Sequence, residues 1–319
     1  MLYPLKFRPI LSSLIWGGEK IIPYKGLDID QKMVGESWEL SGVKGSESVV
    51  AEGELAGKSI TELLTECGEE LIGKANYARF GNEFPLLIKF IDAKQDLSIQ
   101  VHPDDELAAK RHNSKGKTEM WYVVDVDEGA KLRSGFAREV TPEEYVASVE
   151  NDTVTDILKE YEVAPGDLFF LPAGRIHSIG AGCFIAEIQQ TSNITYRIYD
   201  FNRTDAAGNP RELHTEQAVD AIDYKVEADY RTEYDREATD EEVKMVKCDY
   251  FTTSFMSLTK PCQVDYSKLD SFVIYICTEG EASVNGTPFK KGETLLLPAT
   301  TKGVQIETNG CKMLVTYIG

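Results

Sequence analysis

Two histidines and two oxygen-bearing side chains are spaced in this sequence as the ligands of one metal ion would be. Gln100 and His102 alternate with apolar neighbours, so both should project from the same face of one strand. Glu119 follows seventeen residues after His102. His177 ends the pattern Gly-x5-Pro-x-Gly-x2-His of residues 166–177, which predicts a turn, a buried strand, a second turn and a strand that offers an imidazole. Two imidazole nitrogens and two oxygens suit a borderline divalent metal, above all zinc, with a position left for water or substrate.

A single His on a strand usually has a structural role. That explanation is less convincing here, because few His residues are present and half of them lie at ligand positions. The chain has four His residues, and two of them occupy the expected ligand positions. His112 lies in a polar run and is expected in solvent, whereas His214 is expected at a helix start. No thiolate belongs to the set, and mixed nitrogen and oxygen ligands are typical of metals that do chemistry.

The elements that must position these ligands are predicted to be strands of two related β units. Residues 163–173 are echoed at an offset of 126 by residues 289–299, and both copies read as a turn, a buried strand and a turn. Gly303 stands in the second copy where the first has His177, so the second unit lacks that ligand. The ligand spacing resembles the metal motifs of cupins. That resemblance implies a mainly β chain: a cupin, or jelly-roll, barrel with helical decorations, followed by a degenerate, metal-free jelly-roll-like domain.

Three domain-level segments follow from this pattern. Residues 1–228 are expected to form the catalytic domain, the polar run 229–244 a linker, and residues 245–319 the C-terminal β domain. Helix starts are predicted at Ser59 and Thr141 by capping patterns, and a further helix is predicted from Thr215.

Composition limits the partners that the chain can take. The net charge of −19 argues against binding to nucleic acid or an anionic membrane, because both need concentrated positive charge. An anionic small molecule could bind only where basic residues converge. No run approaches the ~20 apolar residues that span a bilayer, no secretory signal is found, and the six scattered cysteines imply no disulfide framework. A cytoplasmic protein is expected, as a monomer or a homodimer.

Several independent motifs between residues 16 and 203 resemble class I mannose-6-phosphate isomerases, the zinc-dependent, cupin-type enzymes, in their compact bacterial form. The motifs are Trp16-Gly17-Gly18, Gly35-Glu36-Ser37-Trp38-Glu39, Leu97 to Asp104, Lys117-Thr118-Glu119-Met120-Trp121, Gly166 to His177 and Thr195-Tyr196-Arg197. The resemblance implies reversible isomerisation of mannose 6-phosphate and fructose 6-phosphate through an enediol(ate). It assigns one zinc ion to the same four residues that the spacing selects, namely Gln100, His102, Glu119 and His177.

The resemblance also implies catalytic residues. It puts Arg197 beside the reacting carbons, Lys117 in the active site, and Glu187 or a zinc-bound water in the proton-transfer machinery. This set suits the chemistry, because removal of a proton next to a carbonyl leaves a negative charge that a fixed guanidinium or a metal stabilises. A desolvated carboxylate would have a raised pKa, which suits proton transfer.

Four further residues are implied at the substrate. Ser98, Lys89 and Arg203 match positions associated with the phosphate end, and Trp16 is expected to line the pocket. Three of the four also have a plainer explanation: Lys89 could reach solvent, Arg203 could pair with Asp205, and Trp16 could belong to the hydrophobic core. Together the basic residues would supply the local positive field that a phosphate needs in this acidic chain.

Two other classes of function compete with an isomerase of mannose 6-phosphate. An iron-dependent cupin dioxygenase is disfavoured because Gln100 stands where a first His would be expected. A non-catalytic sugar-phosphate-binding cupin would be expected to lose a ligand, Arg197 or Glu187, and the sequence retains all of them. Action of a metal cupin on another sugar phosphate stays open.

Overall fold

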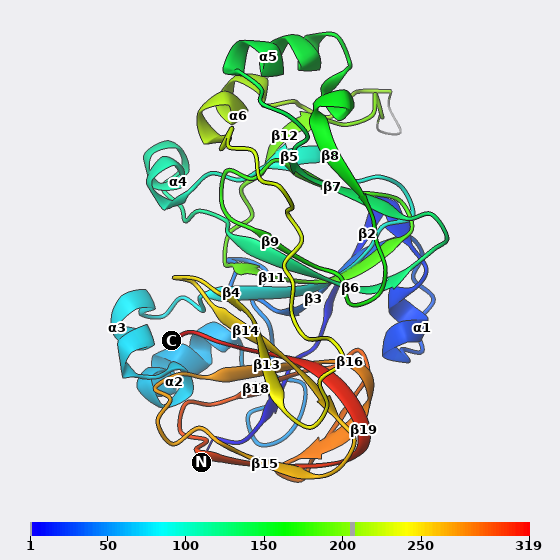
Figure 1. Ribbon diagram of the computed structural model, residues 1–319. Coiled ribbons are helices and arrows are strands. Elements are labelled where there is room, and N and C mark those ends of the chain that lie inside the picture. Colours follow the sequence, from blue (N-terminus) through cyan, green and yellow to red (C-terminus); the bar gives the residue numbers. More distant parts are fainter. Residues whose placement is uncertain (1, 205–207) are drawn as a thin grey trace.

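The computed structural model describes residues 2–204 and 208–319 and is built around three antiparallel sheets (Figure 1). Two of the sheets carry the site and the third contains the C-terminal strands. None of the helices in the described part is long and apolar enough to cross a membrane.

The six-stranded sheet lies at the centre of the molecule and has the order β2-β3-β4-β11-β6-β9. Its strands are β2 (Ile10–Gly18), β3 (Val34–Leu40), β4 (Leu86–Asp92), β11 (Cys183–Gln190), β6 (Glu119–Val126) and β9 (Leu168–Leu171). Every residue of β4 and β11 is buried, as expected for strands covered on both faces.

The five-stranded sheet faces the six-stranded sheet and has the order β12-β5-β10-β7-β8. Its strands are β12 (Tyr196–Tyr199), β5 (Ile99–Val101), β10 (His177–Ile179), β7 (Lys131–Phe136) and β8 (Leu158–Glu162). A shared apolar layer joins the two sheets, with Ile91 and Trp121 from one and Leu132 and Ile179 from the other.

The predicted mainly β, cupin-type fold is confirmed, with one correction about barrel closure. No strand pairing among the described residues closes the facing sheets into a barrel. β5 and β10 are only three residues long, and the chain leaves each as a loop, so their hydrogen-bond ladders end early. The unit is therefore a sandwich of two sheets.

The third sheet has the order β1-β18-β16-β19-β14-β13, with β15 paired to β19 and β17 paired to β16. Its strands are β1 (Leu5–Lys6), β13 (Glu242–Lys247), β14 (Thr252–Leu258), β15 (Cys262–Asp265), β16 (Val273–Val284), β17 (Thr287–Lys290), β18 (Thr294–Leu297) and β19 (Gly303–Tyr317). Strand β18 lies 126 residues after β9 and has the same length, so both copies of the sequence repeat form a four-residue strand.

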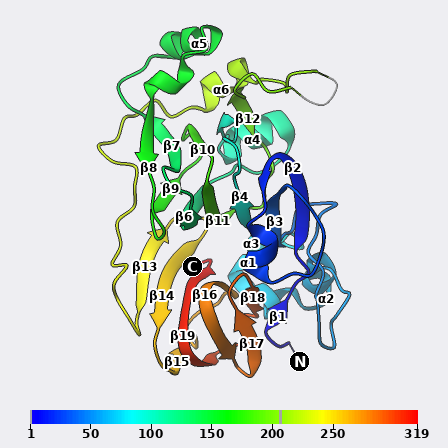
Figure 2. The same cartoon turned by 90° about the vertical axis from the view of Figure 1, so that its right-hand side faces the viewer.

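The third sheet packs on the outer face of the six-stranded sheet (Figure 2). Their common core contains Phe90 and Phe184 of the central sheet and Phe255 and Leu314 of the third. Because side chains alternate along a strand, the next residues of the central sheet point the other way, into the sandwich with the five-stranded sheet. The polar residues of the site lie on that inner face.

Helices decorate both units. They are α1 (Ile21–Lys25), α2 (Ile60–Ile72), α3 (Lys74–Phe80), α4 (Asp105–His112), α5 (Pro142–Glu150), the 3-10 helix η1 (Val154–Ile157) and α6 (Thr215–Ala221). Ser59 forms the predicted capping box with Glu62. Thr141 is the predicted N-cap and forms a capping box with Glu144, and the helix predicted at Thr215 is present.

The polar run 229–244, predicted as a linker, packs along the first unit. Tyr230 is buried: its backbone N–H donates to the hydroxyl of Tyr161 at 2.9 Å, and its own hydroxyl donates to the carbonyl of Phe136 at 3.2 Å. β13 begins inside the run, at Glu242. The division of the chain at residues 228 and 245 stays a prediction.

Candidate active site

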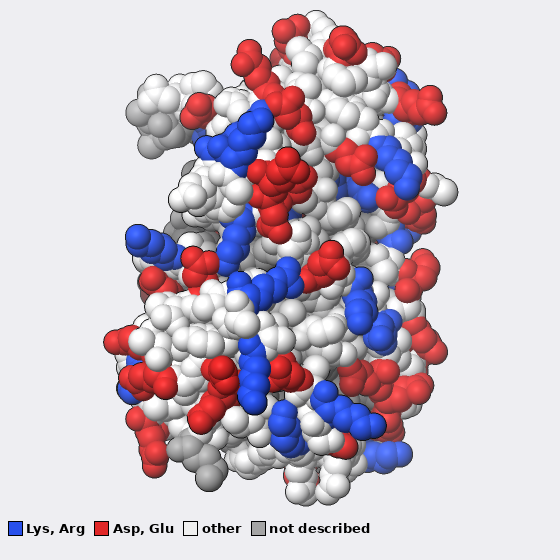
Figure 3. Space-filling view, turned by 90° about the vertical axis from the view of Figure 1, so that its left-hand side faces the viewer, with Lys and Arg blue, Asp and Glu red and all other residues white. Residues whose placement is uncertain are grey.

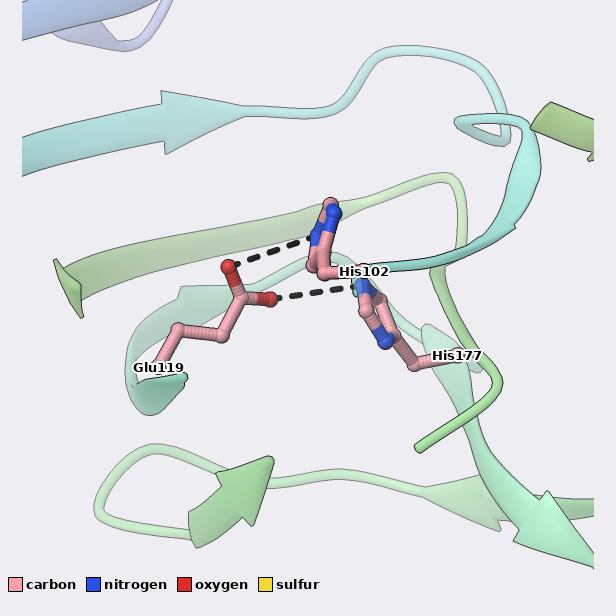
Figure 4. Close-up of side chains that lie close together, drawn as sticks. All are labelled: His102, Glu119 and His177. Carbon is pink, nitrogen blue, oxygen red and sulfur yellow. Dashed lines mark ion pairs between the residues drawn. The ribbon is translucent and has the colours of Figure 1, made fainter. Parts of the chain in front are cut away.

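The predicted metal ligands come together between the two facing sheets. Gln100 and His177 are directly paired on β5 and β10, His102 follows β5, and Glu119 is the first residue of β6. Ligand atoms of His102, Glu119 and His177 all lie within 4.8 Å of one another. In Figure 4 both imidazoles lie against the carboxylate of Glu119.

Backbone carbonyls fix which nitrogen each imidazole offers. Nδ1 of His102 lies 2.8 Å from the carbonyl of Ile194, and Nδ1 of His177 lies 2.7 Å from that of Arg175. A hydrogen bond of this kind places the proton on Nδ1 and leaves the Nε2 lone pair free for a metal. Both Nε2 atoms face Glu119, at 3.6 and 3.3 Å from its carboxylate oxygens.

The electrostatics of the group favour neutral imidazoles. Burial, followed by the ammonium of Lys117, lowers the pKa of His102 well below its usual value, and burial lowers the pKa of His177 to about 3. Both rings are therefore able to act as ligands at neutral pH. Burial and the nearby carboxylate of Glu187 raise the pKa of Glu119.

The donor set fits a divalent cation. Both carboxylate oxygens of Glu119 are fully buried, and neither accepts a well-aligned hydrogen bond from any described residue. Such buried acceptors carry a large cost unless a partner offsets it. The side-chain amide of Gln100, whose Nε2 lies 3.3 Å from Nε2 of His177, borders the same point and could turn its oxygen towards it.

Two lysines and two carboxylates extend the site along the central sheet. Lys117 Nζ lies 2.8 Å from Glu119, 3.1 Å from His102 Nε2 and 4.0 Å from Glu187. Lys89 and Glu187 are paired across β4 and β11, and their charged atoms lie 3.3 Å apart. Trp121 donates to Glu187 at 2.8 Å. Burial by itself raises the pKa of Glu187, but Lys117 and Lys89 outweigh it and lower that pKa.

A cavity of about 380 Å³ opens beside this group. Of the residues predicted at the site, its walls include Trp16, Lys89, Ser98, Gln100, Lys117, Glu187 and Arg197. Arg197 lies on β12 directly across from Gln100, and its Nη1 donates to the carbonyl of Glu212 at 3.0 Å.

Among the residues predicted to contact substrate, Arg203 lies outside the walls of this cavity; the buried His102, Glu119 and His177 lie behind them. The guanidinium of Arg203 donates to Asp200, at 2.5 Å from a carboxylate oxygen, and to the carbonyl of Asp96 at 2.5 Å. The pairing partner suggested from the sequence, Asp205, lies outside the described residues.

The walls also include Trp38, expected from the sequence to line the pocket as Trp16 does, and two residues for which no role was predicted, Glu36 and Arg211. Glu36 and Trp38 alternate on β3, and the indole of Trp38 donates to Glu36 at 2.7 Å. Their spacing could have indicated a shared face. Arg211 lies in an irregular segment after β12, where no periodicity signals its position.

Known proteins are similar to this chain over almost its whole length. Residues 5–130 match the family described as phosphomannose isomerase type I, catalytic domain, and residues 241–318 match mannose-6-phosphate isomerase, cupin domain. Mannose-6-phosphate isomerase ManA of Bacillus subtilis is 35% identical, over 92% of this chain and 93% of its own length. The chain belongs to the type I mannose-6-phosphate isomerase family. The predicted resemblance to the compact bacterial form is confirmed.

Further relatives support the same family. A mannose-6-phosphate isomerase of Streptococcus mutans is 33% identical over 96% of both chains. The crystal structure of the mannose 6-phosphate isomerase from B. subtilis superimposes with a TM-score of 0.88 at 31% identity, covering 99% of each chain. A mutant of phosphomannose isomerase from Salmonella typhimurium shares the fold, with a TM-score of 0.80 at 16% identity.

Proposed function

We propose that the chain interconverts mannose 6-phosphate and fructose 6-phosphate and that it does so with one zinc ion. The observation that carries the proposal is the buried His102, Glu119 and His177 group, which lies beside a cavity whose walls include Gln100, Lys117 and Arg197. Family membership supports the choice of substrate.

Gln100, His102, Glu119 and His177 would hold the zinc ion, because nitrogen and oxygen donors in this ratio suit it. Bound there, zinc would supply Lewis-acid stabilisation of negative charge on substrate oxygens. All other roles in the proposal belong to side chains of the chain itself.

Isomerisation moves a proton between the two carbons next to each other at the carbonyl end of the sugar, and negative charge builds on oxygen as the first carbon loses its proton. Arg197 is proposed to stabilise that charge. Its Nε is buried and has no hydrogen-bond partner among the described residues, so a donor is left for substrate.

Lys117 and Glu187 are proposed as the proton-transfer pair beside the reacting carbons. The ammonium of Lys117 lies between Glu119 and Glu187, and the lowered pKa of Glu187 keeps its carboxylate charged. In this arrangement the charged carboxylate of Glu187 would take the proton from one carbon and return it to the neighbouring carbon. The ammonium of Lys117 would donate a proton to one sugar oxygen and receive one from the other, so that both groups end as they began; both line the cavity.

Ser98, Lys89 and Trp16 are proposed substrate contacts, since all three line the cavity. Lys89 is already neutralised by Glu187 at 3.3 Å and Glu36 at 3.7 Å. Arg203 acts on substrate, in this proposal, only through Asp200. Figure 3 shows acidic and basic side chains interspersed over one face of the molecule, so an anionic substrate depends on cations gathered at the cavity. A cytoplasmic setting is also proposed, supported by six free thiols.

The test is isomerase activity on mannose 6-phosphate, coupled to detection of fructose 6-phosphate, before and after chelation and after zinc is restored. We expect chelation to remove activity and zinc to restore it, with one zinc per chain by elemental analysis. The Glu119→Gln variant should bind less zinc. A folded, zinc-loaded chain without isomerase activity would overturn the proposal and favour a sugar-phosphate-binding protein or another sugar phosphate.

A further inference from the structure

Charge is distributed unevenly along the cavity. At the metal-ligand end, Lys89 and Lys117 are surrounded by three carboxylates, those of Glu36, Glu119 and Glu187. The ammonium groups there are already paired. Excess positive charge lies at three other side chains, Arg197, Arg203 and Arg211, whose nearby carboxylates are those of Asp200 and Glu212.

The three arginines differ in how many of their guanidinium nitrogens are free to bind a ligand. Arg203 uses all three guanidinium nitrogens on Asp200 and on the carbonyl of Asp96. Arg211 uses two: Nε donates to Asp200 at 2.6 Å, and Nη2 donates to the other oxygen of the same carboxylate. Nη1 of Arg211 has no hydrogen-bond partner within the described residues. Arg211, unlike Arg203, also lines the cavity.

The segment that carries Arg211 is hydrogen-bonded to β12, the edge strand of the five-stranded sheet. The backbone N–H of Arg197 donates to Nδ1 of His214 at 3.0 Å, and the N–H of His214 donates to the carbonyl of Arg197 at 2.7 Å. With the bond from Arg197 to Glu212, these contacts hold residues 212–214 along β12. Arg211 and Arg197 are thereby kept side by side.

From this we propose that Arg211, oriented by Asp200, binds the phosphate group of the sugar phosphate. The inference rests on the proposed function for the identity of the substrate, but phosphate recognition can be tested without catalysis. A guanidinium group held in place matches the geometry of phosphate oxygens, and Asp200 is the positioning residue that holds the guanidinium of Arg211. Burial alone would raise the pKa of Asp200, but its bonds from Arg211 and Arg203 lower it, so the carboxylate stays charged.

The arrangement also fixes the direction of the substrate. Phosphate at Arg211 leaves the carbonyl end of the sugar next to Lys117, the metal ligands and Arg197, which lies across from Gln100. The cavity of about 380 Å³ spans both ends.

The experiment compares Arg211→Gln, Arg211→Lys and Asp200→Asn with the wild-type chain, all zinc-loaded. Two quantities are measured: KM and kcat for mannose 6-phosphate, and binding of inorganic phosphate by calorimetry. For Arg211→Gln we expect KM and the phosphate Kd to rise about tenfold or more, with kcat changed much less, because a charge-assisted hydrogen bond is lost. Arg211→Lys should be intermediate, because it keeps the charge without the planar fork. Asp200→Asn should raise KM while kcat is retained.

Arg138→Gln is the matched control. It removes the same charge from an arginine that is 55% exposed and pairs with Glu144 away from the cavity, and it should leave both quantities unchanged. Thermal unfolding of each variant shows whether it is folded. A folded Arg211→Gln that binds phosphate and mannose 6-phosphate like the wild type would overturn this inference while the proposed function stands. A wild-type chain that binds phosphate through Arg211 but does not isomerise would overturn the proposed function alone.

Discussion

The two imidazoles of the candidate metal site are held neutral by their surroundings, and this has an energetic consequence for the metal-free chain. His177 has a pKa of about 3 in the fold, against an ordinary value of 6.5. Between those values the unfolded chain binds a proton at this position that the folded chain does not. Stability from this group is therefore fully present above pH 6.5 and is lost as the pH falls below it.

We predict that this loss can be measured through His177→Gln. In urea unfolding with chelator present, the wild-type free energy of unfolding should fall between pH 6.5 and 5.0 by about 1.5 kcal/mol more than that of the variant. The variant has no imidazole to protonate at this site. Equal falls in the two proteins would mean that His177 is not held neutral.

Spacing along the chain was enough to predict that Gln100, His102, Glu119 and His177 come together. Gln100 and His102 follow strand periodicity, and the turn residues before His177 fix where its strand begins. Arg211 could not be found in this way, because it lies in an irregular segment and reaches the cavity only through contacts of its neighbours with β12. Arg203 was predicted at the phosphate end from resemblance alone. No sequence pattern indicated that its guanidinium would donate to Asp200 and to the carbonyl of Asp96.

At the scale of elements, the wall of the cavity depends on close packing between β2 and β3. Trp16 of β2 is buried, and a Cβ added at Gly35 of β3 would come within 2.6 Å of its ring. The absence of a side chain at Gly35 therefore allows the indole to lie flat against β3 and to line the cavity.

We predict that Gly35→Ala displaces Trp16. Overpacking should lower the free energy of unfolding by about 1–3 kcal/mol, and the displaced wall should lower kcat/KM about tenfold. Gly303→Ala is the control, because nothing lies within 4 Å of a Cβ added there. Both variants would be compared by urea unfolding and by the coupled assay. Full activity in Gly35→Ala would show that Trp16 does not shape the site.

Short apolar runs of the sequence coincide with buried strands. Residues 85–91, 120–124 and 271–276 lie largely within β4, β6 and β16, although β16 continues to Val284. The pairing of β1 with β18 could not have been predicted, since a two-residue strand has no periodicity and its partner is far away in sequence. Barrel closure was predicted from the fold family, and the short ladders of β5 and β10 explain why it is not seen.

At the scale of the whole molecule, the third sheet shares its core with the catalytic unit. Leu5, Phe90 and Leu314 belong to one apolar cluster, although they come from the start, middle and end of the chain. Tyr24 of α1 also donates to the carbonyl of Thr278 at 2.8 Å, which ties the catalytic unit to β16. A stabilising role for the metal-free sheet follows from this shared core.

We predict that the chain unfolds in one calorimetric transition, with agreement between the calorimetric and van't Hoff enthalpies. Leu5→Ala should lower the free energy of unfolding by about 2–5 kcal/mol and keep the single transition, because Leu5 is fully buried in the shared core. Ile29→Ala, at a side chain that is 46% exposed, should change it by less than about 0.5 kcal/mol. Two separate transitions would show that the units unfold independently.

The pairing of β1 with β18 also has a consequence for the nascent chain during translation. Leu5 meets Leu296, so the first strand to be synthesised stays without its neighbour until about 290 further residues have been added. At roughly 5–20 residues per second, that wait is roughly 15–60 s. During translation the N-terminal segment can pair only with the residues around Val50, through the Phe7–Val50 bridge and the bond from the Ala51 N–H to the Lys6 carbonyl, and its β18 edge stays open to a chaperone or a fused tag.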